Sequence, residues 1–175
     1  GSRFWFTAKF GLPVDKDASP QNVTPVPKKS TRRDIKLTET RILLAEDNKI
    51  NQLFTREMLL RFGWKCDVVE NGVEVLEALE SKTYDIVLMD CQMPIMDGFV
   101  TTKHIRERES EKRLDSHLVI VALTANAIQG DRERCLAAGM DEYLAKPFEP
   151  AQLNATIEAC FAEISRRSAC EHAAK

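Results

Sequence analysis

Residues 85–98 read Asp-Ile-Val-Leu-Met-Asp-Cys-Gln-Met-Pro-Ile-Met-Asp-Gly, and the order of residue types in this stretch is the strongest fold signal in the chain. The four residues 86–89 are all apolar, which is typical of a strand that is covered on both faces, as in a parallel sheet. The run stops at Asp90, and Pro94 and Gly98 mark a loop directly after it. The stretch therefore predicts a central strand that ends at an acidic residue.

Strands and helices are predicted to alternate along the chain around this central strand. Runs of strand length are expected at about 41–46, 65–70, 84–89, 117–123 and 142–145. Stretches of helical period fit between them, at about 49–62, 72–81, 97–108, 126–138 and 150–164. Five consecutive strand–helix units require right-handed crossovers and place helices on both faces of a parallel sheet. The predicted fold class is α/β, a doubly wound five-stranded parallel sheet.

The first predicted helix carries an apolar stripe on one side. The stripe repeats at helical spacing, and Gly63 follows it as a natural C-terminal glycine. Its members are Ile50, Leu53, Phe54, Met58 and Phe62.

The 175-residue chain divides into parts of different composition. Residues 1–41 hold nine of the 25 Lys and Arg, only four of the 27 Asp and Glu, and four of the seven prolines. We interpret residues 1–10 as the C-terminal end of another domain, 11–40 as a flexible linker, 41–164 as one folded domain and 165–175 as a tail. The linker contains a basic cluster, but it lacks the interleaved aromatic residues of a nucleic-acid site, so no nucleic-acid partner is expected.

Composition also excludes several classes of protein. The longest apolar run, residues 118–123, is far shorter than the ~20 residues that cross a bilayer, so no membrane contact is expected. No export signal opens the chain, which predicts a cytoplasmic location. The five cysteines are odd in number and form no CxxC pair, which argues against a disulfide framework or a zinc site.

Polar side chains follow four of the predicted strands, and they are Glu46, Asp47, Asp90, Thr124 and Lys146. An Asp after a strand is often only a helix cap or a turn residue. The carboxyl ends of parallel strands share one edge of the sheet, however, so we expect these side chains to meet there. Three clustered carboxylates repel one another unless a cation is present, and all-oxygen ligands suit Mg²⁺. The set fits phosphoryl transfer, with Asp90 as the best nucleophile candidate.

Residues 41–164 resemble the receiver domain of two-component response regulators. The resemblance rests on four motifs in the family's order, namely Leu44-Ala45-Glu46-Asp47-Asn48 with Asn51, residues 88–98, Ala122-Leu123-Thr124-Ala125 and residues 139–148. It implies the strand order 2-1-3-4-5 and Asp90 as phosphoacceptor, with self-catalysed phosphorylation and dephosphorylation. It also implies that Glu46, Asp47, Asp90 and the backbone carbonyl of Gln92 hold Mg²⁺.

The same resemblance assigns the remaining site residues. Thr124 matches the family's switch hydroxyl, Tyr143 its switch aromatic and Lys146 its active-site lysine. The peptide between Lys146 and Pro147 matches one that is usually cis in this family, and a cis bond is plausible only before proline.

Residues 46–51 and 123–126 look especially like receivers that are fused to hybrid sensor histidine kinases. Residues 1–6 resemble the last strand of a kinase ATP-binding domain, although the boxes that bind ATP are missing from the chain. The expected phosphoryl donor is therefore a phosphohistidine of the sensor kinase, and the expected acceptor is a histidine-phosphotransfer domain or protein. A parent kinase anchored in the inner membrane is compatible with a cytoplasmic receiver.

Three other interpretations remain open at this point. A phosphohydrolase with an aspartyl-phosphate intermediate commonly has a second acid two residues after the nucleophile, where this chain has Gln92. A flavodoxin-type binder would have a phosphate-cradling loop after the first strand, where Glu46 and Asp47 stand. A degenerate receiver that acts only as a binding module would not be expected to retain the whole site.

Overall fold

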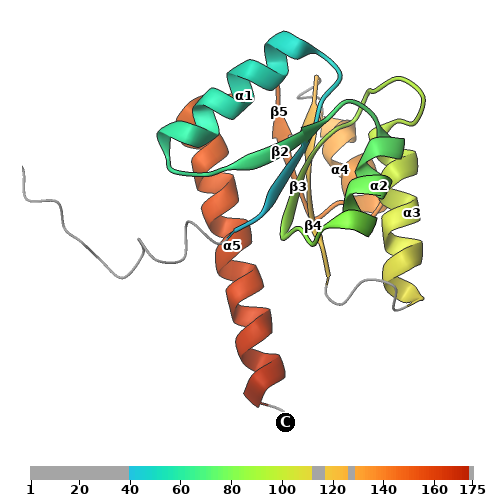
Figure 1. Cartoon of the computed structure of the whole chain (residues 1–175), viewed down its shortest axis with the longest axis vertical. Helices are drawn as coiled ribbons and strands as arrows, with labels where there is room; N and C mark the ends of the chain where they lie inside the picture. Colours follow the sequence, from blue (N-terminus) through green and yellow to red (C-terminus); the bar gives the residue numbers. More distant parts are fainter. Residues whose placement is uncertain (1–39, 112–116, 126–128, 174–175) are drawn as a thin grey trace, which may run out of the picture. The chain divides into compact units, whose positions relative to one another are not determined.

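The computed structural model describes residues 40–111, 117–125 and 129–173 (Figure 1). The predicted strand near the start of the chain and nearly all of the predicted linker lie outside these residues. No helix within the described ranges is both long enough and apolar enough to cross a membrane.

The described residues form a parallel sheet with helices on both faces (Figure 1). The strands are β1 (Ile42–Ala45), β2 (Cys66–Val69), β3 (Ile86–Asp90), β4 (Val119–Thr124) and β5 (Glu142–Ala145). The helices are α1 (Lys49–Arg61), α2 (Gly72–Ser81), α3 (Gly98–Ser110), α4 (Gln129–Ala137) and α5 (Pro150–Ala173). The strand order β2-β1-β3-β4-β5 confirms the predicted fold class and topology.

Two apolar layers hold the helices to the sheet. One layer joins alternate residues of the strands, such as Leu44 and Leu88, to α1 and α5. The other joins the intervening residues, such as Val87 and Met89, to α2, α3 and α4. Every residue of β3 and β4 is buried, as the unbroken apolar runs of the sequence predict for strands covered on both faces.

The apolar stripe of α1 is not the side that packs on the sheet. The buried residues of this helix are Thr55, Met58 and Leu59. Of the predicted stripe only Met58 is buried; the other members, Ile50, Leu53, Phe54 and Phe62, are exposed by 77%, 62%, 62% and 38%. Helical period groups residues on one side but does not determine which side faces the sheet.

The last helix is longer than the sequence pattern predicts. We expected it to end near residue 164 and a tail to follow, but α5 continues to Ala173. No glycine or proline stands after Ile164 to stop the helix. Glu163 also pairs with Arg166 and Arg167, three and four residues further on, which supports the continued helix. The other predicted ends coincide with the observed ones or differ from them by at most three residues.

Candidate functional site

Three carboxylates meet at the carboxyl end of the sheet, as predicted. Glu46 and Asp47 follow β1, and Asp90 is the last residue of the neighbouring strand β3. One carboxylate oxygen of each lies within 4.8 Å of the others. Glu46 and Asp90 are buried, at 1% and 8% exposed, whereas Asp47 is exposed. The cluster therefore has two fixed acids and one that faces solvent.

Hydrogen bonds from the start of α1 hold Glu46 in place. Asn51 Nδ2 donates to Glu46 Oε1 at 2.7 Å, and Gln52 Nε2 donates to the Glu46 backbone carbonyl at 2.6 Å. Asn48 caps the helix by accepting hydrogen bonds from the Ile50 and Asn51 N–H groups. These contacts fix the rotation of α1 relative to β1. No role was predicted for Gln52 from the sequence, where its only signal is a polar side chain in the first turn of the helix.

Asp90 lies at the start of a tightly packed loop. Its Oδ1 accepts a hydrogen bond from the Gln92 N–H at 3.0 Å, and the next residue, Cys91, donates its N–H to the carbonyl of Leu123 on β4. Gly98 begins α3 directly against this loop, where an added Cβ would come within 2.3 Å of the Asp90 carbonyl oxygen. Only glycine therefore fits at position 98 without moving the loop that carries Asp90.

Lys146 supplies the positive charge of the site. Its Nζ donates to Asp90 Oδ2 at 2.6 Å and to Glu46 Oε2 at 2.5 Å. Burial lowers the pKa of Lys146, but the hydrogen bonds to the two carboxylates outweigh it, so that the pKa is raised above its ordinary value. The side chain is thus an ammonium at neutral pH. The Lys146–Pro147 peptide is cis, and the Lys146 N–H donates to the Thr124 carbonyl at 2.7 Å.

The two predicted switch residues lie on neighbouring strands but at different distances from the acidic edge, the carboxyl end of the sheet where Glu46, Asp47 and Asp90 lie. Thr124 is the buried last residue of β4 and pairs with Ala145. Tyr143 pairs with Ala122, two residues further from the acidic edge, and is half-buried. The guanidinium of Arg132 on α4 lies 5.6 Å from the centre of its ring. The structure therefore groups the carboxylates of Glu46, Asp47 and Asp90, with Lys146 bonded to two of them. Thr124 lies beside this group and Tyr143 lies apart from it.

The donor atoms of this site fit a hard divalent cation. All the side chains that could act as ligands, Glu46, Asp47 and Asp90, offer carboxylate oxygens, which Mg²⁺ prefers. Opposite ligands of Mg²⁺ lie about 4 Å apart, so a group whose oxygens all lie within 4.8 Å of one another is close to the size that one ion requires.

The strand order and the acidic edge together define a receiver-type α/β domain. Residues 42–158 match the family described as the response regulator receiver domain. This match covers more than half of the chain, and the chain belongs to that family.

Among known proteins, the chain is similar to hybrid signal transduction histidine kinase K of Dictyostelium discoideum, at 38% identity over 90% of this chain. It spans only 13% of that kinase. The solved receiver domain of the sensor histidine kinase PA1611 of Pseudomonas aeruginosa, which has a magnesium ion in its active-site cleft, is 43% identical over 70% of this chain and 98% of its own, with a TM-score of 0.62. The receiver domain of Ssk1 from Saccharomyces cerevisiae, solved with the histidine phosphotransfer protein Ypd1, is 30% identical over 67% of this chain and 86% of its own, also with a TM-score of 0.62.

Proposed function

We propose that the chain is the receiver part of a hybrid sensor histidine kinase and that Asp90 accepts a phosphoryl group in a phosphorelay. The observation that carries this proposal is the position of Lys146, which bonds to both Asp90 and Glu46 at the acidic edge. A carboxylate nucleophile is thereby placed beside a cation and two further carboxylates, which are the parts that phosphoryl transfer requires.

In the proposed reaction, a carboxylate oxygen of Asp90 attacks the phosphorus of a phosphohistidine. The new O–P bond forms as the N–P bond to the histidine breaks, and the released imidazole nitrogen regains a proton from solvent. Glu46, Asp47, Asp90 and the backbone carbonyl of Gln92 would hold Mg²⁺, which supplies positive charge to the phosphoryl oxygens. Lys146 already contacts Asp90 and is placed to neutralise a further phosphoryl oxygen.

The proposed switch involves the two strands next to Asp90. Phosphorylation adds negative charge and acceptor oxygens at the end of β3. The hydroxyl of Thr124 moves toward these oxygens, and Tyr143 then turns inward. That rotation changes the surface formed by α4, β5 and α5.

The exposed apolar residues of α1 support a histidine-phosphotransfer protein or domain as the relay partner. Ile50 and Phe54 border a groove of about 430 Å³ that continues to Lys146, Pro147 and Phe148 beside the site. An apolar patch of this kind next to a reactive group is typical of a protein-binding surface. A helix laid in this groove would bring a histidine close to Asp90, because Lys146 borders the groove and also contacts Asp90.

The similarity to the Dictyostelium kinase supports the proposed domain division. Residues 42–175 make up less than 90% of the chain, so a match over 90% reaches into the segment before Ile42. This agrees with residues 11–40 as a linker within a hybrid kinase, and we propose residues 1–10 as the end of its kinase domain. A kinase phosphohistidine as donor and a cytoplasmic location follow from the same proposal.

The rival functions have less support. Gln92 offers no second acid at the position where a phosphohydrolase of this type commonly has one. A degenerate receiver is disfavoured because the three acids are all present and close together, and Lys146 bonds to two of them, Glu46 and Asp90.

The proposal is tested by incubating the whole chain with acetyl phosphate and Mg²⁺ and measuring its mass. We expect the gain of one phosphoryl group, absent from Asp90→Asn and retained by the control Asp67→Asn, which changes an exposed carboxylate on β2. A phosphoryl group that persists in Asp90→Asn would contradict the assignment. Transfer from the phosphorylated chain to a purified histidine-phosphotransfer protein then tests the relay.

A further inference from the structure

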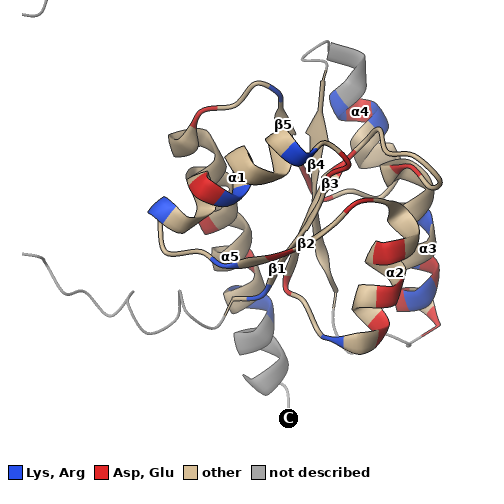
Figure 2. Cartoon of the chain, turned by 45° about the horizontal axis from the view of Figure 1, so that its top comes forward, with Lys and Arg blue, Asp and Glu red and all other residues tan. Residues whose placement is uncertain are grey.

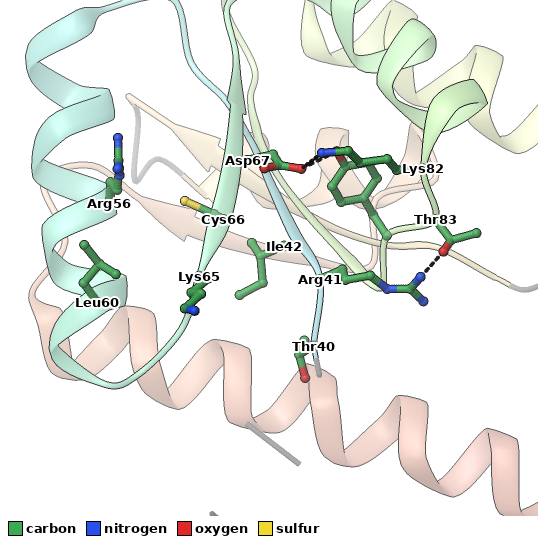
Figure 3. Close-up of a pocket in the computed structure, with 11 residues that line it drawn as sticks. Thr40, Arg41, Ile42, Arg56, Leu60, Lys65, Cys66, Asp67, Lys82 and Thr83 are labelled. Atoms are coloured by element: carbon green, nitrogen blue, oxygen red, sulfur yellow. Dashed lines mark hydrogen bonds and ion pairs between the residues drawn. The ribbon is translucent and has the colours of Figure 1, made fainter. Parts of the chain in front are cut away.

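A cavity lies at the opposite end of the sheet from Asp90, around the starts of β1, β2 and β3 (Figure 3). Its volume of about 620 Å³ is in the range of pockets that hold small ligands, roughly 300–1,000 Å³. Ile42 and Cys66, the first residues of β1 and β2, form part of its wall. The cavity is therefore separate from the acidic edge.

Basic side chains dominate the lining of this cavity. The lining holds four basic residues and a single carboxylate, Asp67. The basic residues are Arg41, Arg56, Lys65 and Lys82. The chain after residue 41 is acidic as a whole, since it holds 23 Asp and Glu against 16 Lys and Arg. Figure 2 shows acidic residues on α2 and residues of both charges on α3, and it shows basic charge at the start of β1. The cavity is thus a local concentration of positive charge.

Part of this charge is already neutralised by neighbouring carboxylates. Lys82 Nζ lies 3.0 Å from Asp67 Oδ2, and the Tyr84 hydroxyl donates to the same oxygen at 2.8 Å (Figure 3). Arg41 donates to Thr83 Oγ1, and its Nε lies 3.6 Å from Asp85 Oδ2. Two of the four positive charges are therefore paired with a carboxylate.

The other two basic side chains have no such partner. The side chains of Arg56 and Lys65 form no hydrogen bond or ion pair with any residue that the structure describes. They come from α1 and from the segment just before β2, and both lie on the α1 side of β2 together with Cys66 (Figure 3). Two unpaired cations from different segments of the chain thus border one cavity.

The remaining titratable groups do not offset these charges at neutral pH. Burial raises the pKa of the Cys66 thiol to about 11. Burial, with the hydrogen bond to Asp67, raises the pKa of Tyr84 to about 12. Both groups therefore stay neutral, and the cavity keeps its positive charge.

We propose that this cavity binds a small anion that carries phosphate or carboxylate groups. The Arg56 guanidinium offers a planar fork of donors that matches either group, and the Lys65 ammonium adds a second positive charge to the lining of the same cavity. The volume suits a small molecule, and two unpaired cations suit one or two anionic groups. The inference does not depend on the chemistry of Asp90.

The test is an NMR titration of the ¹⁵N-labelled whole chain, in metal-free buffer at constant ionic strength, with pyrophosphate and with citrate in separate arms. We expect saturable shifts of amides around residues 41–42, 65–67 and 82–84. The double variant Arg56→Gln, Lys65→Gln should raise Kd at least about tenfold, because it removes two charge contacts. The control Lys103→Gln, Arg166→Gln changes the net charge equally at exposed positions elsewhere and should leave Kd within about twofold.

The arms of the experiment separate the possible outcomes. Saturation by pyrophosphate alone or by citrate alone identifies the phosphate or the carboxylate class. Absence of saturation, shifts centred on Lys146, or equal weakening in both double variants would overturn the proposal. Binding of a hexaglutamate peptide without binding of either small anion would also overturn it, in favour of a protein partner. Arg56 and Lys65 are exposed, so the variant should fold, and shifts in the unmodified chain locate the site independently.

Discussion

Lys146 Nζ lies 2.6 Å from Asp90 Oδ2, although 56 residues separate the two in the chain. The same ammonium also reaches Glu46, which is 1% exposed. In the resting protein Lys146 therefore counters the repulsion between two buried carboxylates, before any phosphoryl group is present. This gives the residue a structural role in addition to its proposed role in phosphoryl transfer.

Replacing Lys146 by Gln should destabilise the fold. The change leaves Asp90 and Glu46 buried without their cation, so we expect the free energy of unfolding to fall by about 1–3 kcal/mol, less than for a fully buried pair because Lys146 is partly exposed. Urea unfolding measures the loss. Adding Asp90→Asn to the variant should recover part of the stability, since one repelling charge is gone. An unchanged stability in Lys146→Gln would show that the contacts with Asp90 and Glu46 contribute little.

The stabilising effect of Lys146 should disappear at alkaline pH. Its pKa is raised in the folded chain, so its contribution is complete below the unfolded lysine value of about 10.4 and is lost as the pH rises through the higher folded value. The difference in unfolding free energy between the unmodified chain and Lys146→Gln should therefore be constant through neutral pH and shrink above that range. Urea unfolding of both proteins across this range provides the measurement, and a difference that grows with pH would contradict the assignment.

Gly98→Ala should disturb the phosphoacceptor loop. Its Cβ would lie 2.3 Å from the Asp90 carbonyl oxygen, so the loop must move, and we expect a loss of about 2 kcal/mol or more together with slower phosphorylation. The matched control is Gly63→Ala. It has φ +86° and no neighbour within 4 Å, so it should cost only about 1 kcal/mol of backbone strain and leave phosphorylation unchanged. Equal effects of the two variants on phosphorylation would contradict the prediction.

Phe54→Ser should slow phosphoryl transfer to the relay partner without destabilising the fold. Phe54 is 62% exposed, so the substitution should change stability by less than about 0.5 kcal/mol. Phosphoryl transfer to a histidine-phosphotransfer protein should nevertheless slow, because the apolar groove beside Asp90 loses one wall. Val100→Ser, on α3 and 45% exposed, is the control and should transfer normally. Normal transfer by Phe54→Ser would place the docking surface elsewhere.

Arg132→Ala should make phosphorylation easier. The guanidinium over Tyr143 favours the ring position of this structure, and such a contact contributes about 0.5–1 kcal/mol at an exposed site. Its loss should raise the phosphorylation rate with acetyl phosphate by about two- to fivefold if the inward ring accompanies the reactive state. Arg134→Ala loses a similar contact, 4.5 Å from the Phe99 ring centre, and should show no increase. Equal phosphorylation rates in the unmodified chain, Arg132→Ala and Arg134→Ala would show that Arg132 takes no part in the switch.

The central part of the fold could be predicted because its signals are local. An unbroken apolar run of strand length, as in β3 and β4, indicates burial on both faces, and repeated strand–helix units leave few topologies. The acidic edge was predictable for the same reason: once Glu46 and Asp90 stand at the carboxyl ends of parallel strands, the sheet brings them together. The strand order itself came from the resemblance to the receiver family, and the sheet confirms it.

The parts that the sequence did not reveal depend on contacts between distant segments. The rotation of α1 is set by the bonds of Asn51 and Gln52 to Glu46, so the tertiary structure decided that Ile50 and Phe54 face outward.

The basic cavity is a second case of this kind. Its cations come from α1, from the starts of β1 and β2 and from the segment before β3, and each looks in the sequence like an ordinary exposed Lys or Arg. Residue types and their spacing therefore determined the sheet and its acidic edge, because those follow from backbone periodicity. Only the packed chain determined which side chains became neighbours, because that depends on the rotation of each helix and on the length of each loop.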